Sequence, residues 1–415
     1  MTRKNVVYLV ADSLRADHLG CYGAEDVLTT EIDRLAEEGV LFENVVSSAP
    51  WTVPSIATHT TGTYPHRLQV FNPEDDISAK TDSVFERFKD AGYATAVHFD
   101  SERRMAQFQS GVDHHGWSYD IEDVLEFITD HSDEPFFMFN LYRGTHLPYV
   151  LKYSREAWYR AKEEMMDRLR EGTPEAIANV KYRYARSVEH FSEWYLRAIL
   201  DRLEREGILE DTVVVVTSDH GESWDRRYDD LSDLELYDLH GPLLYDEVLK
   251  VPLVIYNLGT AEGHRVEEMV RSVDVLPTLL DALDMPHETG PDADIDGTSL
   301  APAVDGDVSR VDFPDLAFSS TTNYESPSDA ELTTVGKFAV RDDTWKLLWT
   351  PDTDQTELYN LDADPEETTD RAADEPAKTA ELLAILEGEV RETDSSYSED
   401  EEQALQDRLE DLGYL

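Results

Sequence analysis

The sequence predicts an α/β protein in which helices sandwich a mostly parallel sheet, followed by a smaller C-terminal α+β subdomain. Up to residue 283, short apolar runs alternate with helical patterns, and this alternation is typical of a parallel sheet covered on both faces. Near residue 310 the pattern changes to the strands of a small antiparallel sheet. The 415 residues also exceed the roughly 250 to 300 residues that a single core supports. We therefore expect two units, residues 1–310 and 311–415.

The individual elements follow from their apolar patterns. The runs NVVYLVAD (5–12) and DTVVVVTSDHGE (211–222) contain continuous β-branched stretches, as expected of strands buried on both faces. Further strands are expected at 41–48, 94–100, 134–142 and 250–257, with helices at 31–40, 83–93 and 272–283 and long amphipathic helices within 154–207. In the C-terminal part we expect strands at 337–351 and 355–361 and a helix at 377–392.

The charge balance is extreme, with 89 acidic residues against 36 basic ones and a net charge of −53. The acidic residues are spread along the chain, which suits a cell interior rich in salt, where the Debye length falls to about 3 Å and self-repulsion costs little. A halophilic protein is therefore our first interpretation; an acidic partner-binding surface is the alternative, although such surfaces usually form one block. Nucleic acid is excluded as a partner because its phosphates would be repelled.

The cysteine count and the hydropathy pattern bear on the cellular compartment. With Cys21 as the single cysteine, no internal disulfide can form, and we expect it to be a small buried side chain. No signal-peptide core and no apolar run of about 20 residues is found, so no membrane span is expected. We predict a cytoplasmic protein; the sequence leaves its oligomeric state open.

Polar side chains follow several of the predicted strands. In open α/β sheets, ligands bind beyond the carboxyl ends of the strands, so residues at these positions are candidates for a site. The candidates are Asp12, Ser13, Thr52, His146, Asp219, His220 and His240. Each has an ordinary structural explanation, because a lone Asp after a strand is more often a helix cap and a lone His in a loop is usually solvated. Their coincidence at four strand ends favours a divalent metal held by carboxylates and imidazole.

Thr52 lies in SSAPWTVPSIATHTTGTYPHR (47–67), at the predicted start of a helix. Pro54 suits a first helical turn, and the amides and dipole of that turn favour an anion near Thr52. Thr52 is either an ordinary helix cap or a nucleophile. A hydroxyl is a poor nucleophile at neutral pH, but metal coordination lowers its pKa and activates it.

Several segments resemble, in order, those of the sulfatase family within the alkaline phosphatase superfamily. VYLVADSLRADHLGCYG is similar to the first metal-binding segment, APWTVPSIATHTTGTYPHR to the nucleophile segment, and RGTHLPY to a His-x-Pro segment that contacts substrate. DTVVVVTSDHGE resembles the second metal-binding segment, and HGPLLYDEVLKVPLVI the stretch after it. WKLLWTPDTDQTELYNLDADPEE and LEDLGYL resemble the C-terminal subdomain. With the acidic composition, this suggests a halophilic archaeal type.

The resemblance implies an alkaline phosphatase-like fold, with catalysis in residues 1–310, and a role for each candidate. Asp12, Asp219 and His220 would bind the metal with Thr52 as fourth ligand and nucleophile. His146 and His240 would hold the ester oxygens or protonate the leaving group. Ser13 stands where many sulfatases have a second Asp. One carboxylate fewer makes calcium less favoured, and manganese, magnesium or zinc more so.

The main departure from the family pattern is at residue 52. True sulfatases have Cys-x-Pro-Ser-Arg there, and the Cys becomes formylglycine, whereas this chain reads Thr52-Val53-Pro54-Ser55-Ile56. Thr cannot become that aldehyde, so no formylglycine is expected. An aldehyde hydrate can expel sulfate with its second hydroxyl, but a sulfated Thr must wait for water or another acceptor. Threonine at this position occurs in superfamily members that hydrolyse phosphodiesters or transfer phosphoglycerol-type groups.

Three functions follow from these observations. The first is a metal-dependent hydrolase or transferase that cleaves a sulfate or phosphate ester through a covalent Thr52 intermediate, with a small anionic ester, glycan- or lipid-linked, as substrate. The second is a phosphodiesterase or phosphotransferase acting on lipid or glycan precursors. The third belongs to another class, a catalytically silent binding protein that keeps the fold.

Other candidate contacts are less specific. Arg15 and Asn72 are near the candidate site in sequence, and we predict that they touch substrate; a structural role is the alternative. Arg341 and Lys346 could reach the pocket from the second domain. We expect substrate selectivity to come from the loops around 100–120 and 220–240 and from the helices within 154–207.

Overall fold

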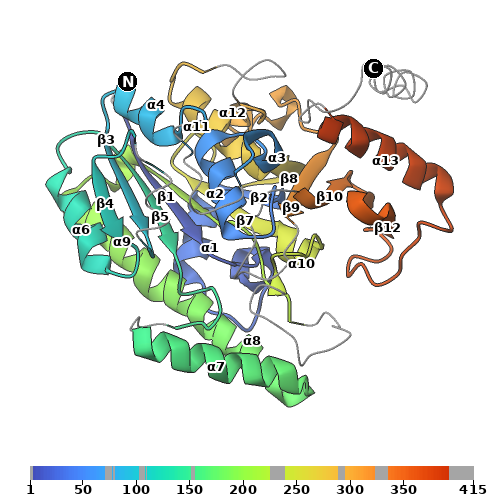
Figure 1. Cartoon of the computed structure of the whole chain (residues 1–415). Helices are drawn as coiled ribbons and strands as arrows, with labels where there is room; N and C mark the ends of the chain where they lie inside the picture. Colours follow the sequence, from blue (N-terminus) through green and yellow to red (C-terminus); the bar gives the residue numbers. More distant parts are fainter. Residues whose placement is uncertain are drawn as a thin grey trace.

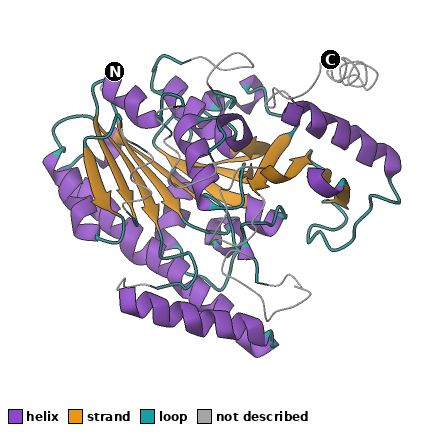
Figure 2. Cartoon of the chain, in the orientation of Figure 1, coloured by secondary structure: helices purple, strands orange, loops and turns teal. Residues whose placement is uncertain are grey.

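The computed structural model describes residues 3–70, 80–101, 110–150, 155–224, 239–287, 295–322 and 335–391, together with Ile77 and Phe108. Within these residues the chain forms an eight-stranded sheet, here the large sheet, and a four-stranded sheet, the small sheet. Helices lie on both sides of the large sheet, and the small sheet lies beside it with one long helix (Figures 1 and 2).

The large sheet has the strand order β4-β3-β5-β1-β6-β7-β2-β8. Its strands are β1 (Asn5–Ala11), β2 (Val40–Val46), β3 (Ala94–Phe99), β4 (His114–Trp117), β5 (Phe136–Tyr142), β6 (Thr212–Thr217), β7 (Lys250–Tyr256) and β8 (His264–Arg271). Neighbouring strands are parallel except β7, which runs antiparallel to β6 and β2. The predicted mostly parallel sheet is confirmed.

The central strand β1 shows why both faces of the large sheet are covered. Its side chains alternate between two hydrophobic cores, because successive residues of a strand point to opposite faces. Val6, Tyr8 and Val10 join one core and Val7 and Leu9 the other.

Each core is closed by its own set of helices. The core of Val6 includes residues of α2 (Thr52–Thr61), α4 (Val84–Asp90), α11 (Val275–Ala282) and α12 (Ala301–Val304). The core of Val7 includes residues of α1 (Thr30–Glu38), α6 (Ile121–Asp130), α7 (Arg155–Glu171), α8 (Pro174–His190) and α9 (Arg197–Glu206). The π-helical turn Phe191–Leu196 joins α8 to α9, and the short helices are α3 (Pro65–Leu68) and α10 (Asp246–Leu249).

The small sheet is antiparallel throughout, in the order β12-β11-β10-β9. Its strands are β9 (Ala317–Thr322), β10 (Val335–Arg341), β11 (Trp345–Thr350) and β12 (Gln355–Asn360), and α13 (Pro376–Arg391) packs on one face. Its other face contributes to a core that also contains Val46, Leu249 and Met269 of the large domain.

The sequence-based elements agree with the structure in most places. The expected strand 337–351 is two strands, β10 and β11, which pair with each other. The sequence analysis does not predict β4, α6, β8 and β9; β4 is short, and β8 carries charged residues on its exposed positions. Cys21 is half-buried rather than fully buried. The predicted C-terminal motif LEDLGYL lies outside the described residues.

The strand directions decide which residues meet at the edge of the large sheet. β1, β2, β3, β5 and β6 all run the same way, so their carboxyl ends lie at one edge. The antiparallel β7 starts at that edge, and residues that precede it are therefore brought there as well. This explains how His240, which comes before a strand, joins residues that follow strands.

Candidate active site

Three of the predicted site residues form a tight buried group at the carboxyl edge of the large sheet, which we call the active-site cluster. Asp12 follows β1, and Asp219 and His220 follow β6, and all three are fully buried. One ligand atom of each lies within 4.8 Å of the other two. His220 Nε2 lies 3.7 Å from Asp12 Oδ1 and 3.5 Å from Asp219 Oδ2. These distances bring together residues about 200 positions apart in sequence.

Ser13 fixes the two carboxylates of the active-site cluster. Its backbone is left-handed, with φ of +64°, a conformation that costs free energy in a non-glycine residue. That conformation directs its amide to Asp219 Oδ1 at 3.1 Å, while its hydroxyl donates to Asp12 Oδ1 at 3.2 Å. Ser13 therefore orients both carboxylates from the position at which the sequence suggested a missing ligand.

Hydrogen bonds from its first two turns attach the helix α2 to the segment that carries Asp219. Thr52 is the first residue of α2 and is buried. One turn on, Ser55 Oγ donates to the carbonyl oxygen of Asp219 at 2.6 Å, and His59 Nε2 lies 3.2 Å from the Ser218 carbonyl oxygen. Tyr8 Oη contacts the other ring nitrogen of His59 at 2.8 Å. His59, expected to be packed, holds the helix on the sheet.

His146 and His240 lie beside the cluster, and each has a fixed orientation. The His240 ring stacks on that of His220 with centroids 4.6 Å apart, and the His146 ring is 5.3 Å from that of His240. His240 Nδ1 lies 2.8 Å from Glu222 Oε1, and His146 Nδ1 lies 2.6 Å from the Leu147 carbonyl oxygen. In both rings the Nδ1 contact fixes the orientation of the imidazole.

Glu222 is a functional candidate that the sequence interpretation missed. It is fully buried, and burial raises its pKa to about 8, with the Asp12 charge adding to the effect. Tyr149 Oη, which accepts a hydrogen bond from Trp224 Nε1 at 2.7 Å, lies 3.4 Å from Glu222 Oε2. Glu222 ends the segment DTVVVVTSDHGE, two residues after His220. This short spacing from a predicted metal ligand is the sequence feature that could have identified it.

Arg143 is a second missed residue and places a fixed cation next to the cluster. Its Nη1 donates to Asp12 Oδ2 at 2.9 Å, and its Nε lies 3.3 Å from Asp100 Oδ2. Burial opposes the charged form, but the Asp100, Asp12 and Asp219 carboxylates outweigh it and raise the pKa of Arg143. An anionic ester beside Asp12 would therefore meet a guanidinium held in place by two carboxylates.

Arg15 lies next to the site but is committed to protein partners. Its guanidinium donates to Asp17 at 2.7 and 2.9 Å and to the Glu222 carbonyl oxygen at 2.8 Å, and it stacks on Trp224 at 5.0 Å. It lines a polar cavity with Asp17 and Glu247. Substrate contact by Arg15 stays a prediction, and Asn72 lies outside the described residues.

A cavity of about 710 Å³ opens beside the cluster. Arg143 and His146 lie in its wall, and much of the rest is aromatic. The aromatic residues are Tyr119, Tyr142, Trp158, Tyr159, Trp194 and Tyr195. All except Tyr142, which ends β5, come from the loop after β4 and from the helices within 155–206, two of the regions expected to govern selectivity. The third region, 220–240, is described only at its ends.

The donor set of the active-site cluster fits a divalent cation. Among the described residues, neither Asp219 Oδ2 nor His220 Nε2 has a hydrogen-bond partner, although both are buried. Burial and the Asp12 charge raise the pKa of Asp219, as expected of a buried carboxyl group next to a second carboxylate. Two carboxylates and an imidazole match the preferences of manganese, magnesium or zinc.

The sequence comparisons agree with the geometry. Residues 4–285, more than half of the chain, match the family described as Sulfatase. The chain belongs to the sulfatase family. Residues 228–396 match a second description, N-sulphoglucosamine sulphohydrolase, C-terminal. Members of the sulfatase family are metal-dependent, in keeping with the active-site cluster.

Two proteins with sequence similarity to this chain are named as a sulfatase and a sulfotransferase. An ulvan-active sulfatase of Formosa agariphila is 26% identical over 327 residues, which cover 67% of this chain and 61% of that protein. The low-salt glycan biosynthesis sulfotransferase Agl7 of Haloferax volcanii is 28% identical over 297 residues, which cover 68% of this chain and 61% of that protein. The matched region thus spans 61% of the length of both relatives.

Solved structures support the sulfatase-family fold. The phosphonate monoester hydrolase of Agrobacterium radiobacter superposes with a TM-score of 0.75, covering 94% of this chain and 95% of that one. At 19% identity, this likeness concerns the fold alone. Among the described residues, we find no helix that is long and apolar enough to cross a bilayer.

Proposed function

We propose that this sulfatase-family chain is a metal-dependent enzyme that cleaves a sulfate or phosphate ester through a covalent Thr52 intermediate. The observation that carries the proposal is the attachment of α2 to the cluster, because Ser55 in its first turn donates to the carbonyl oxygen of Asp219. Thr52 is the first residue of α2, three residues before Ser55, and this attachment supports its proposed place beside the cluster. We further propose that residues 1–310 form the catalytic domain and 311–415 a C-terminal subdomain.

In the first step, the Thr52 hydroxyl would lose its proton to solvent, and Oγ1 would attack the sulfur or phosphorus atom and displace the alcohol oxygen of the ester. A divalent cation held by Asp12, Asp219 and His220 would lower the pKa of the Thr52 hydroxyl and offset the negative charge of the ester. The first-turn amides of α2 and the Arg143 guanidinium would hold the remaining oxygens of the anion.

His240 is our candidate for the residue that protonates the leaving oxygen. Glu222 holds its Nδ1, so that Nε2 is the donor toward the substrate. His146 is better suited to holding an ester group, because burial and the nearby Arg143 charge lower its pKa well below the ordinary value. A neutral His146, with Nδ1–H directed at the Leu147 carbonyl, offers the Nε2 lone pair.

In the second step, an acceptor oxygen would attack the same atom and release Thr52. Water as acceptor gives hydrolysis, and a glycan hydroxyl gives transfer. Thr52 has no second hydroxyl with which to expel the group, so the intermediate would last until an acceptor arrives. The relative named as a glycan-biosynthesis sulfotransferase supports transfer as the second candidate outcome.

The aromatic cavity supports a substrate with a sugar or aryl group. Aromatic faces such as those of Trp158 and Trp194 stack on flat apolar surfaces, while Arg143 in the same wall suits the anionic group. The relatives named for ulvan and low-salt glycan support a glycan-linked ester. A phosphodiester of a lipid or glycan precursor is the alternative substrate.

The decisive experiment compares Thr52→Ala with Thr58→Ala in the same helix. Loss of the nucleophile should lower kcat by at least about a thousandfold, whereas Thr58, a buried residue whose hydroxyl has no hydrogen-bond partner among the described residues, should be replaceable with little effect. Full activity in Thr52→Ala would rule out the covalent role.

A substrate panel separates the remaining alternatives. Aryl sulfate, phosphate monoester and phosphodiester substrates would be tested with divalent cations, and intact-mass analysis of the quenched reaction would detect the group added to Thr52. Because sulfuryl and phosphoryl groups add nearly the same mass, the substrate that yields the adduct decides: an adduct formed from the aryl sulfate identifies a sulfuryl enzyme, and one formed only from the phosphoesters identifies the phosphoester alternative. Absence of both turnover and bound metal would favour the silent binding protein.

A further inference from the structure

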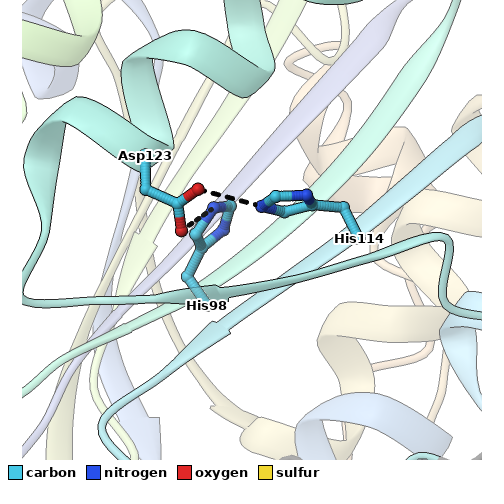
Figure 3. Close-up of side chains that lie close together, drawn as sticks. All are labelled: His98, His114 and Asp123. Atoms are coloured by element: carbon cyan, nitrogen blue, oxygen red, sulfur yellow. Dashed lines mark ion pairs between the residues drawn. The ribbon is translucent and has the colours of Figure 1, made fainter.

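A second group of possible metal ligands lies away from the active-site cluster. His98 of β3, His114 of β4 and Asp123 of α6 converge, with one ligand atom of each within 4.8 Å of the other two (Figure 3). His114 Nε2 lies 3.2 Å from Asp123 Oδ1, and His98 Nε2 lies 3.9 Å from Asp123 Oδ2. Three separate elements thus contribute one side chain each.

His98 is the most unusual member of this group. Its side chain is fully buried, yet neither ring nitrogen has a hydrogen-bond partner among the described residues. His114 Nε2 is likewise without a hydrogen bond, despite its short distance to the carboxylate. A buried polar atom left unpaired costs about 1–3 kcal/mol, so two such atoms beside one carboxylate, His98 Nε2 and His114 Nε2, indicate a missing partner.

The surroundings hold the group in place. Gly116 of β4 passes so close that a Cβ there would lie 2.3 Å from both Asp123 Oδ2 and His98 Cδ2. The amide of Trp117 donates to Asp123 Oδ2 at 3.0 Å and fixes the carboxylate. His98 itself is neutral at physiological pH, because burial and the neighbouring His114 lower its pKa to about 3.

We propose that His98, His114 and Asp123 bind a second divalent transition-metal ion of the Zn²⁺ class. Ligand bonds of about 2.0–2.2 Å in a tetrahedral site place neighbouring ligand atoms about 3.3–3.6 Å apart, a range that lies between the 3.2 Å and 3.9 Å separations of the two imidazoles from Asp123. Imidazole favours zinc, nickel or copper over magnesium and calcium. The His114 and Asp123 side chains are partly exposed, at 37% and 27%, so the group lies near the protein surface although His114 Nε2 itself is buried.

The proposed ion has a structural role. It would tie the edge strand β4 and the helix α6 to β3. The loop between β4 and α6 carries Ser118 and Tyr119, which line the aromatic cavity. Asp100, the partner of Arg143, follows β3 two residues after His98. Metal binding at this site therefore braces one wall of the cavity.

Zinc binding to the full-length chain tests the proposal. We expect chelator-treated wild-type protein to bind one more equivalent of Zn²⁺ than His114→Ala, as measured by elemental analysis after removal of free metal. His115→Ala is the matched control, because His115 lies next in β4 with its Nε2 3.3 Å from the Phe108 carbonyl oxygen, and it should bind as much zinc as wild type. Equal zinc content in His114→Ala and His115→Ala would overturn the proposal.

A variant without the two active-site carboxylates distinguishes zinc binding at this site from zinc binding at the active-site cluster. In Asp12→Asn/Asp219→Asn protein, Zn²⁺ should still raise the unfolding temperature, and adding Asp123→Asn should remove that increase. If zinc stabilises the protein equally with and without Asp123, the site does not bind metal. If the double variant fails to fold, the same comparison of Asp123→Asn with wild type is made by zinc content.

Discussion

Two groups of buried charge in this protein differ in how the charges are compensated. At the junction with the small sheet, Asp246 of α10 lies 2.7 Å from Arg341 Nη1 and 2.8 Å from Lys346 Nζ. Lys346 Nζ also lies 2.8 Å from Glu367 Oε1, and the Asp246 amide donates to the other oxygen of that carboxylate at 2.6 Å. These four residues, the junction cluster, bring two cations to two carboxylates.

The active-site cluster is compensated less completely, because the Arg143 guanidinium pairs with Asp12 but also with Asp100. Burial and the Asp12 charge raise the pKa of Asp219. Burial would also raise the pKa of Asp246, but Lys346 and Arg341 outweigh it and hold that pKa well below its usual range. The comparison teaches that burial alone does not mark a functional carboxylate. What separates the two sites is whether protein cations or an added cation complete the charge balance.

The substitution Asp219→Asn tests this comparison most directly and has the largest expected effect. We expect kcat to fall by at least about a thousandfold, because a proposed metal ligand is lost. The metal-free variant should nevertheless unfold at the same temperature as metal-free wild type or higher, since a carboxylate with a raised pKa has been replaced by a neutral amide. Activity assays and thermal unfolding in chelator measure both. Destabilisation of the metal-free protein would mean that Asp219 is mainly structural.

The junction cluster should show the reverse behaviour. Asp246→Asn should lower the free energy of unfolding by about 3–5 kcal/mol, because it leaves Lys346 and Arg341 buried with one carboxylate fewer. The activity of the remaining folded protein should stay close to wild type. Denaturant unfolding measures the loss, with Glu156→Gln, from an exposed ion pair on α7, as the control that should change nothing measurable. A large fall in kcat at unchanged stability would contradict this assignment.

The pH dependence of the unfolding free energy of the metal-free protein tests the raised pKa of Glu222. Its folded-state pKa of about 8 lies above the ordinary value of 4.5, so protonated Glu222 stabilises the fold below about pH 4.5. That contribution is lost as the pH rises from 4.5 through 8. Glu222→Gln, which cannot ionise, should lose less stability over this range when unfolding by denaturant is measured at each pH. Parallel profiles for the two proteins would show that Glu222 does not titrate there.

Salt should produce the smallest and most general effect. With a net charge of −53, the folded chain should gain several degrees in unfolding temperature, and activity, as KCl rises to molar concentration. The deficit of Asp246→Asn relative to wild type should change little, because buried pairs are screened less than surface charges. Equal wild-type stability in dilute buffer would count against the halophilic interpretation.

Much of the fold and the centre of the site can be predicted from local patterns. Buried strands have continuous apolar sequences, and chemistry-bearing residues follow their ends, so Asp12 and Asp219 can be identified from the sequence alone. β4 and β8 cannot, since a four-residue edge strand and a strand with charged exposed positions lack that pattern. Arg341 and Lys346 are possible pocket residues by sequence, but their cations pair with Asp246, a partner about 100 positions away.

The sequence by itself determined the class of sheet, the family resemblance and which residues end the strands. Only the tertiary structure decided which side chains become partners. Glu222 contacts His240 Nδ1, Arg143 pairs with both Asp12 and Asp100, and His98 faces Asp123. The reason is physical. Strand periodicity is a local property of the chain, whereas the distance between two charges depends on strand order, direction and register, which are fixed only when the cores pack.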